Sequence, residues 1–168
     1  MIQEEYSYSK FPNLKEPARR VTASLLNAMR FMDSTKECVL ILSGMPETAK
    51  QIHGQAHKYG EYWDAFGDIL HQRHLLQEFP GTPELDEQPD VTRAFEIVIT
   101  CMDEVESALV EFIRAAEAEK LYPLARAAEN LQMQNSTDYT LWLQAKDMWE
   151  RGDISRTSFE GWIEDLFD

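Results

Sequence analysis

The feature that most constrains the fold of this chain is the spacing of its apolar residues, which recur every three or four positions over long stretches. The most regular stretch lies between residues 90 and 119. Its members are Phe95, Val98, Met102, Val105, Leu109, Phe112 and Ala116. This period gathers the apolar side chains on one face of an α-helix, and the alternation typical of a strand is absent from the sequence. The sequence therefore predicts an all-α protein.

Prolines, glycines and a capping residue divide the chain into long helical segments. Pro17 suits the first turn of a helix, and Pro46 follows a break at Gly44. Asp90 is a favourable N-cap, and Gly152 ends the last long segment. The helices that we predict cover about residues 17–42, 47–79, 90–119 and 121–151, with a short one over 155–167.

The lengths of the connections predict how the helices are arranged. Short turns join the first helix to the second and the third to the fourth, whereas a longer loop rich in proline and acid separates the second from the third. This pattern predicts a single four-helix-bundle domain over residues 1–168 with a short C-terminal helix. Asn135, Ser136 and Thr137 favour hydrogen bonds between side chain and backbone, so a kink or a break is expected in the fourth helix.

The charge and the cysteines limit the classes of partner and the compartment. With 16 basic against 30 acidic residues, the net charge of -14 repels phosphate backbones and anionic membrane surfaces. The sequence has no apolar run of about 20 residues for a membrane span, and its first ten residues are unlike a secretory signal. Cys38 and Cys101 lie in apolar stretches without a Cys or His partner. We expect buried free thiols, a cytoplasmic protein, and neither a nucleic-acid nor a membrane partner.

The second predicted helix contains all four histidines of the chain. His53, His57, Asp64, Asp68 and His71 are spaced by 4, 7, 4 and 3 residues, which places them along one line beside the apolar stripe. Imidazole and carboxylate together suit iron, zinc or manganese, and ligands three or four positions apart can converge on one ion. These five residues are the candidate metal ligands. The alternative is a half-exposed helix whose polar edge contains histidines for no such reason.

Carboxylates on the other helices are candidates to complete a metal site. Asp33 and Glu37 lie late in the first helix, near His53 and His57 if the first connection is tight. Further acidic residues lie on the third and fourth helices, namely Asp103, Glu104, Glu106 and Asp138. Each of them alone is more simply explained as a solvated acid of an acidic protein.

Several positions of the second helix follow a known pattern. The dipeptide Ile52-His53 is followed by Tyr62, by an aspartate at Asp68 fifteen positions after the histidine, and by Arg73. This segment resembles the second helix of mini-ferritins of the Dps (DNA-protection-during-starvation) family, where a Leu-His dipeptide precedes an Asp-x-x-Ala-Glu-Arg pattern. A looser similarity at residues 116–119 and 141–143 extends the resemblance over most of residues 17–150.

The resemblance implies a fold, an assembly and an activity. It implies a ferritin-like bundle that forms a symmetric homo-oligomer, from a dimer up to a dodecamer, and binds iron or another divalent metal at an interface. His53 and Asp68 would be iron ligands. Ferrous iron would be oxidised by peroxide or oxygen and stored, in protection against oxidative stress. The chain departs from the family at Gln72, where a glutamate is usual, and at Ile41, which occupies the position twelve residues before His53 where the family has a histidine.

Three alternatives stay open. The two departures are consistent with a diverged, metal-free ferritin-like scaffold. The segment Ala65–Leu70 is similar to the Glu-Leu-Gly-Asp-x-Leu pattern of MazG-like nucleoside triphosphate pyrophosphohydrolases, which use magnesium, and Glu61 and Asp64 lie nearby. That family also has a Glu-x-x-Glu pair upstream, which this sequence lacks. The third alternative is a bundle that only interacts with partner proteins.

Overall fold

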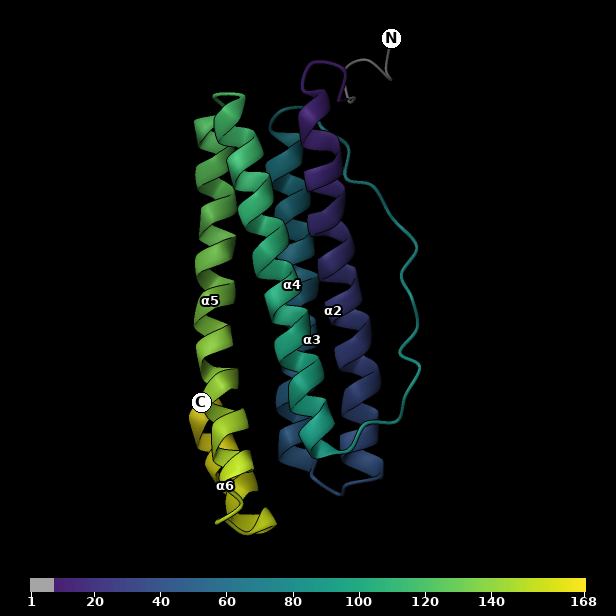
Figure 1. Ribbon diagram of the computed structural model, residues 1–168, viewed down its shortest axis with the longest axis vertical. Helices are drawn as coiled ribbons and strands as arrows, with labels where there is room; N and C mark the ends of the chain where they lie inside the picture. Colours follow the sequence, from purple (N-terminus) through teal and green to yellow (C-terminus); the bar gives the residue numbers. More distant parts are fainter. Residues whose placement is uncertain (1–7) are drawn as a thin grey trace.

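Five α-helices and one short 3-10 helix make up the regular structure of residues 8–168, the part of the chain that this computed structural model describes (Figure 1). In chain order they are η1 (Pro12–Leu14), α2 (Lys15–Ile41), α3 (Pro46–His71), α4 (Val91–Ala118), α5 (Tyr122–Arg151) and α6 (Arg156–Phe167). No described residue belongs to a strand. The all-α class and the short C-terminal helix are therefore confirmed.

The four long helices form a bundle in which each packs against two neighbours. Helix α2 contacts α3 and α4, and α5 contacts the same two helices from the other side. Tight turns join α2 to α3 and α4 to α5, whereas residues 72–90 travel the length of the bundle (Figure 1). Because of this crossover, α3 and α4 run in the same direction. The architecture is a four-helix bundle with one long crossover connection.

The helix boundaries follow local signals at most ends. Asp90 caps α4, its side chain accepting a hydrogen bond from the backbone N–H of Arg93 at 2.8 Å. The hydroxyl of Ser155 caps α6 by accepting from the N–H of Ser158. Gly152 ends α5 with a φ of 69°, a left-handed conformation that glycine adopts without steric cost. These stop and start signals are readable in the sequence because capping is local.

Helix α3 ends at His71, so the prediction that it continues to about residue 79 was wrong. Leu75 is fully buried, and its N–H donates back to the carbonyl of Leu70. Gln77 then donates to the carbonyl of Trp63 and lies so close to Gly67 that a Cβ there would overlap its amide oxygen. Because of these contacts the chain folds back on α3 well before Pro80, the first proline after this helix.

Helix α5 is continuous, so the predicted interruption at residues 135–137 does not include a break. Asn135 is buried, and its side-chain amide donates to the carbonyl of Met102 on α4 instead of competing for its own backbone. The hydroxyl of Thr137 donates to the carbonyl of Met133, one turn earlier. The helix stays continuous here although a hydroxyl that bonds to the carbonyl one turn earlier tends to bend a helix.

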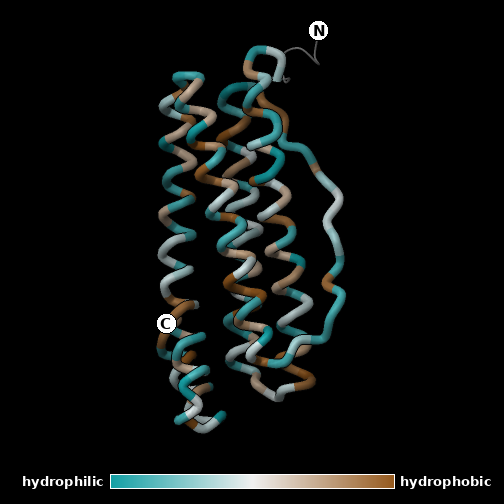
Figure 2. The backbone as a smooth tube through the Cα atoms, in the orientation of Figure 1, coloured by the Kyte–Doolittle hydropathy of each residue, from teal (hydrophilic) through white to brown (hydrophobic). Residues whose placement is uncertain are grey.

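The core runs along the axis of the bundle. Figure 2 shows apolar positions recurring along each long helix, interleaved with polar ones. The apolar stripe predicted for α4 is buried throughout, from Phe95 to Ala116. Helix α6 closes one end of the bundle with Phe159 and Ile163, and Glu160 accepts hydrogen bonds from the first N–H groups of α3. Within residues 8–168, no helix is long and apolar enough to cross a membrane.

The two cysteines differ in environment, which corrects the expectation that both are buried. Cys101 lies in the core at 3% exposure, whereas Cys38 is only half-buried. Val39 occupies the core position of this turn of α2, and successive helical residues are separated by about 100° around the axis. Cys38 and Leu40 therefore flank the core position although the surrounding sequence is apolar throughout.

Candidate functional site

The five candidate metal ligands share the outward face of α3. His57, Asp64, Asp68 and His71 are exposed and His53 is half-buried, whereas the apolar stripe of the same helix is buried on the opposite side. The line extends over 18 residues, or about 27 Å at 1.5 Å per residue. The five side chains of one chain therefore cannot meet at a single ion.

Two of the five side chains are brought together. The Nε2 atoms of His53 and His57 lie 3.0 Å apart, and the two rings meet edge to face with their centroids 4.4 Å apart. The pair forms because residues four positions apart are neighbours on a helix surface. The two Nε2 atoms thus face each other at hydrogen-bond distance on the surface of the helix.

A carboxylate from α2 holds the first of these imidazoles. Nδ1 of His53 lies 3.2 Å from Oδ1 of Asp33, across the contact between α2 and α3. When Nδ1–H donates to this carboxylate, Nε2 carries the lone pair and accepts from the N–H of His57. The same arrangement, a carboxylate behind an imidazole, orients histidine ligands in metal sites.

Glu37 lies on α2 one turn beyond Asp33. Its carboxylate accepts a hydrogen bond from Lys36 at 2.8 Å. This hydrogen bond lowers the pKa of Glu37, with a smaller contribution from the charge of His53. The expectation that Asp33 and Glu37 lie near the histidine pair is therefore met. The histidine pair therefore has two carboxylates of α2 nearby, of which Glu37 is paired with Lys36.

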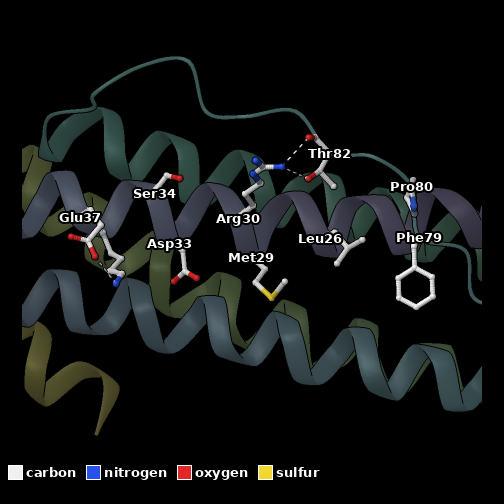
Figure 3. Close-up of a pocket in the computed structure, with 10 residues that line it drawn as sticks. Leu26, Met29, Arg30, Asp33, Ser34, Glu37, Phe79, Pro80 and Thr82 are labelled. Atoms are coloured by element: carbon white, nitrogen blue, oxygen red, sulfur yellow. Dashed lines mark hydrogen bonds and ion pairs between the residues drawn. The ribbon is translucent and has the colours of Figure 1, made fainter.

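Asp33 and Glu37 also line the end of a cleft of about 670 Å³ between α2 and the crossover. Figure 3 shows Asp33 and Met29 on the side of α2 that is turned toward α3, and Arg30 reaching to Thr82 of the crossover. The guanidinium of Arg30 also binds the carboxylate of Glu84 at 3.0 Å. These contacts tie the crossover to α2 beside the acidic end of the cleft.

The other candidate carboxylates have different surroundings. Burial, and then the neighbouring Asp103, raises the pKa of Tyr139, and Glu106 accepts a hydrogen bond from Gln132 at 2.8 Å. Glu104 borders a separate cleft between α2 and α4. None of these contacts involves the histidine pair. Among residues 8–168, no group of three or more His, Cys, Asp or Glu side chains is placed to hold one ion.

Asp138 is the centre of a buried network on the opposite face of α3. It is only 4% exposed, and its carboxylate accepts hydrogen bonds from three side chains of α3. Their donor atoms are Nε2 of Gln55 at 3.0 Å, Nζ of Lys58 at 3.0 Å and the hydroxyl of Tyr62 at 2.7 Å. A metal ion would have to compete with these three donors for the carboxylate.

The network continues into the core on both sides of Asp138. The carbonyl of the Gln55 side chain accepts from the indole N–H of Trp142, and the hydroxyl of Tyr59 donates to Asn135 at 2.6 Å. Burial, and then the nearby charge of Asp138, raises the pKa of Tyr59. Burial and the hydrogen bond to Asp138 raise the pKa of Tyr62 as well.

Sequence reasoning missed the partners of Asp138. Gln55, Lys58 and Tyr62 follow each other at steps of three and four residues on α3, toward α5. A glutamine on the core side of an apolar helix was the available signal, because buried amides require hydrogen-bond partners. The partner itself lies 83 residues further along the chain, so its identity was not readable from the spacing.

No protein-family model matches the chain, and neither does any curated protein sequence.

Proposed function

We propose that this protein is a ferritin-like bundle that binds divalent metal ions, iron among them, on the outward face of α3. The observation that carries the proposal is the His53–His57 pair, held by Asp33 on the exposed face of a bundle with one long crossover. A single long crossover is the connectivity of ferritin-like folds. Imidazole and carboxylate groups are ligands of iron and of other divalent transition metals.

Iron oxidation would require a second copy of the chain. His53 and Asp68 are fifteen residues apart, about 22 Å along the helix, so one chain cannot bring both to the same iron. Two copies packed through α3 with two-fold symmetry would place His53 of one chain near Asp68 of the other. The proposal therefore includes a homo-oligomer and oxidation of ferrous iron by peroxide or oxygen, with storage of the product.

A ferrous oxidation assay tests the proposal. Fe(II) is added anaerobically, peroxide or oxygen follows, and the absorbance of ferric iron is recorded by stopped flow for the parent and for His53→Ala/Asp68→Ala. We expect rapid oxidation that saturates at a few irons per chain and is lost in the double variant. Glu61→Ala, which removes an exposed carboxylate from the same helix, is the matched control and should behave like the parent.

Two other results would replace the proposal. Oxidation no faster than in buffer would leave a metal-free scaffold that keeps only the fold. Release of pyrophosphate from nucleoside triphosphates with magnesium would instead support the pyrophosphohydrolase alternative.

The native mass tests the assembly separately. Two chains of 19.5 kDa give about 39 kDa, and twelve give about 234 kDa. A monomeric protein at micromolar concentration would contradict a site shared between copies.

A further inference from the structure

We propose that His53 and His57 form a clamp for one Cu²⁺ or Ni²⁺ ion, which a single chain binds without help from a second copy. The inference rests on the proposed metal binding by this face of α3, and it specifies the ion class and the ligands. It depends neither on iron oxidation nor on assembly. The clamp consists of the two Nε2 atoms, with Asp33 behind His53.

The distance between the two nitrogens is close to the separation of neighbouring ligands in a square-planar or octahedral complex. Ligand nitrogens about 2.1 Å from an ion and 3.0 Å apart subtend an angle of about 90° at the metal. This is the angle between neighbouring ligands in a square-planar or octahedral complex. A tetrahedral site would need the nitrogens about 3.4 Å apart, so Zn²⁺ would have to push the rings apart. Tetragonal sites of this kind are typical of Cu²⁺ and Ni²⁺.

The ligand types favour the same ions. Affinities of nitrogen donors rise from Fe²⁺ through Ni²⁺ to Cu²⁺. The nearest carboxylate, Asp33, lies at Nδ1 of His53. It therefore orients this imidazole and does not itself act as a hard oxygen ligand. The clamp by itself therefore favours late transition metals over iron. Because His57 is exposed and His53 half-buried, water supplies the remaining ligands.

The clamp is largely formed before an ion arrives. Both histidines lie in the interior of α3, where the backbone is fixed, and Asp33 holds the first ring. Binding requires that the hydrogen bond between the rings open, that His57 carry its proton on Nδ1, and that both Nε2 lone pairs turn to the ion. A site with so little to order loses little affinity to conformational entropy. Asp33 is thus a positioning residue, which acts on the metal through His53.

Titration calorimetry with Ni²⁺ and electron paramagnetic resonance with Cu²⁺ test the clamp on the intact chain. We expect one ion per chain, two coordinated nitrogens in the Cu²⁺ spectrum, and weaker binding of Zn²⁺ and Fe²⁺. His57→Ala should weaken binding at least about tenfold and leave one coordinated nitrogen. Asp33→Asn should weaken binding about tenfold while both nitrogens stay coordinated. His74→Asn is the matched control, because it removes a histidine outside the clamp and asparagine tolerates the positive φ of that residue.

Several results would overturn the inference. They are unchanged Ni²⁺ binding in His57→Ala, equal loss in His74→Asn, a stoichiometry of one ion per two chains, and a preference for Fe²⁺ over Ni²⁺. Circular dichroism of each variant checks that the helices are retained. We expect them to be retained because Asp33, His57 and His74 are exposed.

Asp68→Ala separates the two proposals. It should keep the Ni²⁺ affinity of the parent, whereas it should reduce iron oxidation. If the parent binds Ni²⁺ at the clamp but does not oxidise iron, only the proposal of iron oxidation is rejected. If the parent oxidises iron in a saturable manner but Ni²⁺ binding does not depend on His57, only the clamp proposal is rejected.

Discussion

The two faces of α3 hold polar groups in opposite states. On the face toward α5, Gln55, Tyr59 and Tyr62 are buried, and each makes a hydrogen bond with a residue of α5. On the outward face, His53 and His57 bond mainly to each other and to Asp33, in contact with water. This difference separates the polar groups that stabilise the fold from those that are available to bind a ligand.

The physical reason is the cost of burial. A polar group removed from water is costly unless it finds a partner, so the inner face of α3 is closed by protein hydrogen bonds. An exposed imidazole exchanges its water partner for a metal ion at little cost to the fold. We therefore expect changes on the inner face to affect folding and changes on the outer face to affect binding.

Asp138→Ala should have the largest effect on stability. It leaves the buried donors of Gln55 and Tyr62 without an acceptor, which costs about 3 kcal/mol of unfolding free energy. Lys58 adds little because its side chain is 49% exposed and regains water. Urea unfolding followed by circular dichroism measures the loss. Asp68→Ala, on the exposed face, is the control and should change stability by less than about 0.5 kcal/mol. Equal effects of the two substitutions would remove the distinction between the faces.

Addition of Ni²⁺ should stabilise the parent through the outward face. Free Ni²⁺ at ten times its dissociation constant adds about 1.4 kcal/mol by mass action. For a chain of 168 residues this corresponds to about 3–6 °C in Tm, measured by thermal unfolding. His57→Ala, which binds at least about tenfold more weakly, should gain at most about 0.4 kcal/mol at the same Ni²⁺ concentration, or about 1–2 °C in Tm. An equal Tm increase in this variant would show that the ion binds elsewhere.

Tyr62→Phe should cost about 1 kcal/mol at neutral pH, because Asp138 loses one of its donors. The pKa of Tyr62 is raised in the folded state, so the native protein holds this proton more tightly than the unfolded chain does. The stabilisation is therefore complete below the ordinary value of about 10 and declines as the pH rises above it. The parent should lose its advantage over Tyr62→Phe between about pH 10 and pH 11. A gap that widens in this range, in urea unfolding at each pH, would contradict the assigned direction.

The two thiols should differ in their rate of reaction with a thiol reagent. Burial raises the pKa of Cys101 to about 12, with a smaller contribution from Glu104. Cys38 is half-buried on α2, one turn from Ser34, which lines the cleft between α2 and the crossover. In the native protein, a thiol reagent at pH 8 should modify Cys38 roughly tenfold or more faster than Cys101. Mass spectrometry of peptides after timed labelling distinguishes them, and comparable rates would place Cys101 nearer to solvent.

Much of the architecture was predictable because its signals are local. The apolar period of α4, the cap at Asp90 and the stop at Gly152 each depend on a few neighbouring residues. The end of α3 was not predictable in this way, since it depends on Leu75 and Gln77 folding back onto Leu70 and Trp63. The retained helix at Asn135 has the same explanation, because its side chain finds partners on α3 and α4.

The candidate site shows the same division. The spacing of His53 and His57 follows from the helix period, and their pairing could be expected once α3 was predicted. The position of Asp33 was an expectation that depended on a tight connection between α2 and α3. The five residues of the line were expected beside the apolar stripe, and the structure shows that four of them are exposed and that His53 is half-buried.

By itself, the sequence determined that the chain forms long amphipathic helices, that one connection is long, and that two histidines share a turn of α3. Only the tertiary structure decided where α3 ends, which carboxylate stands behind His53, and that Asp138 is closed off by Gln55, Lys58 and Tyr62. The reason is that a helix fixes the relation between residues a few positions apart through its backbone hydrogen bonds. The rotation and register of one helix against another depend on how all side chains of the core pack together.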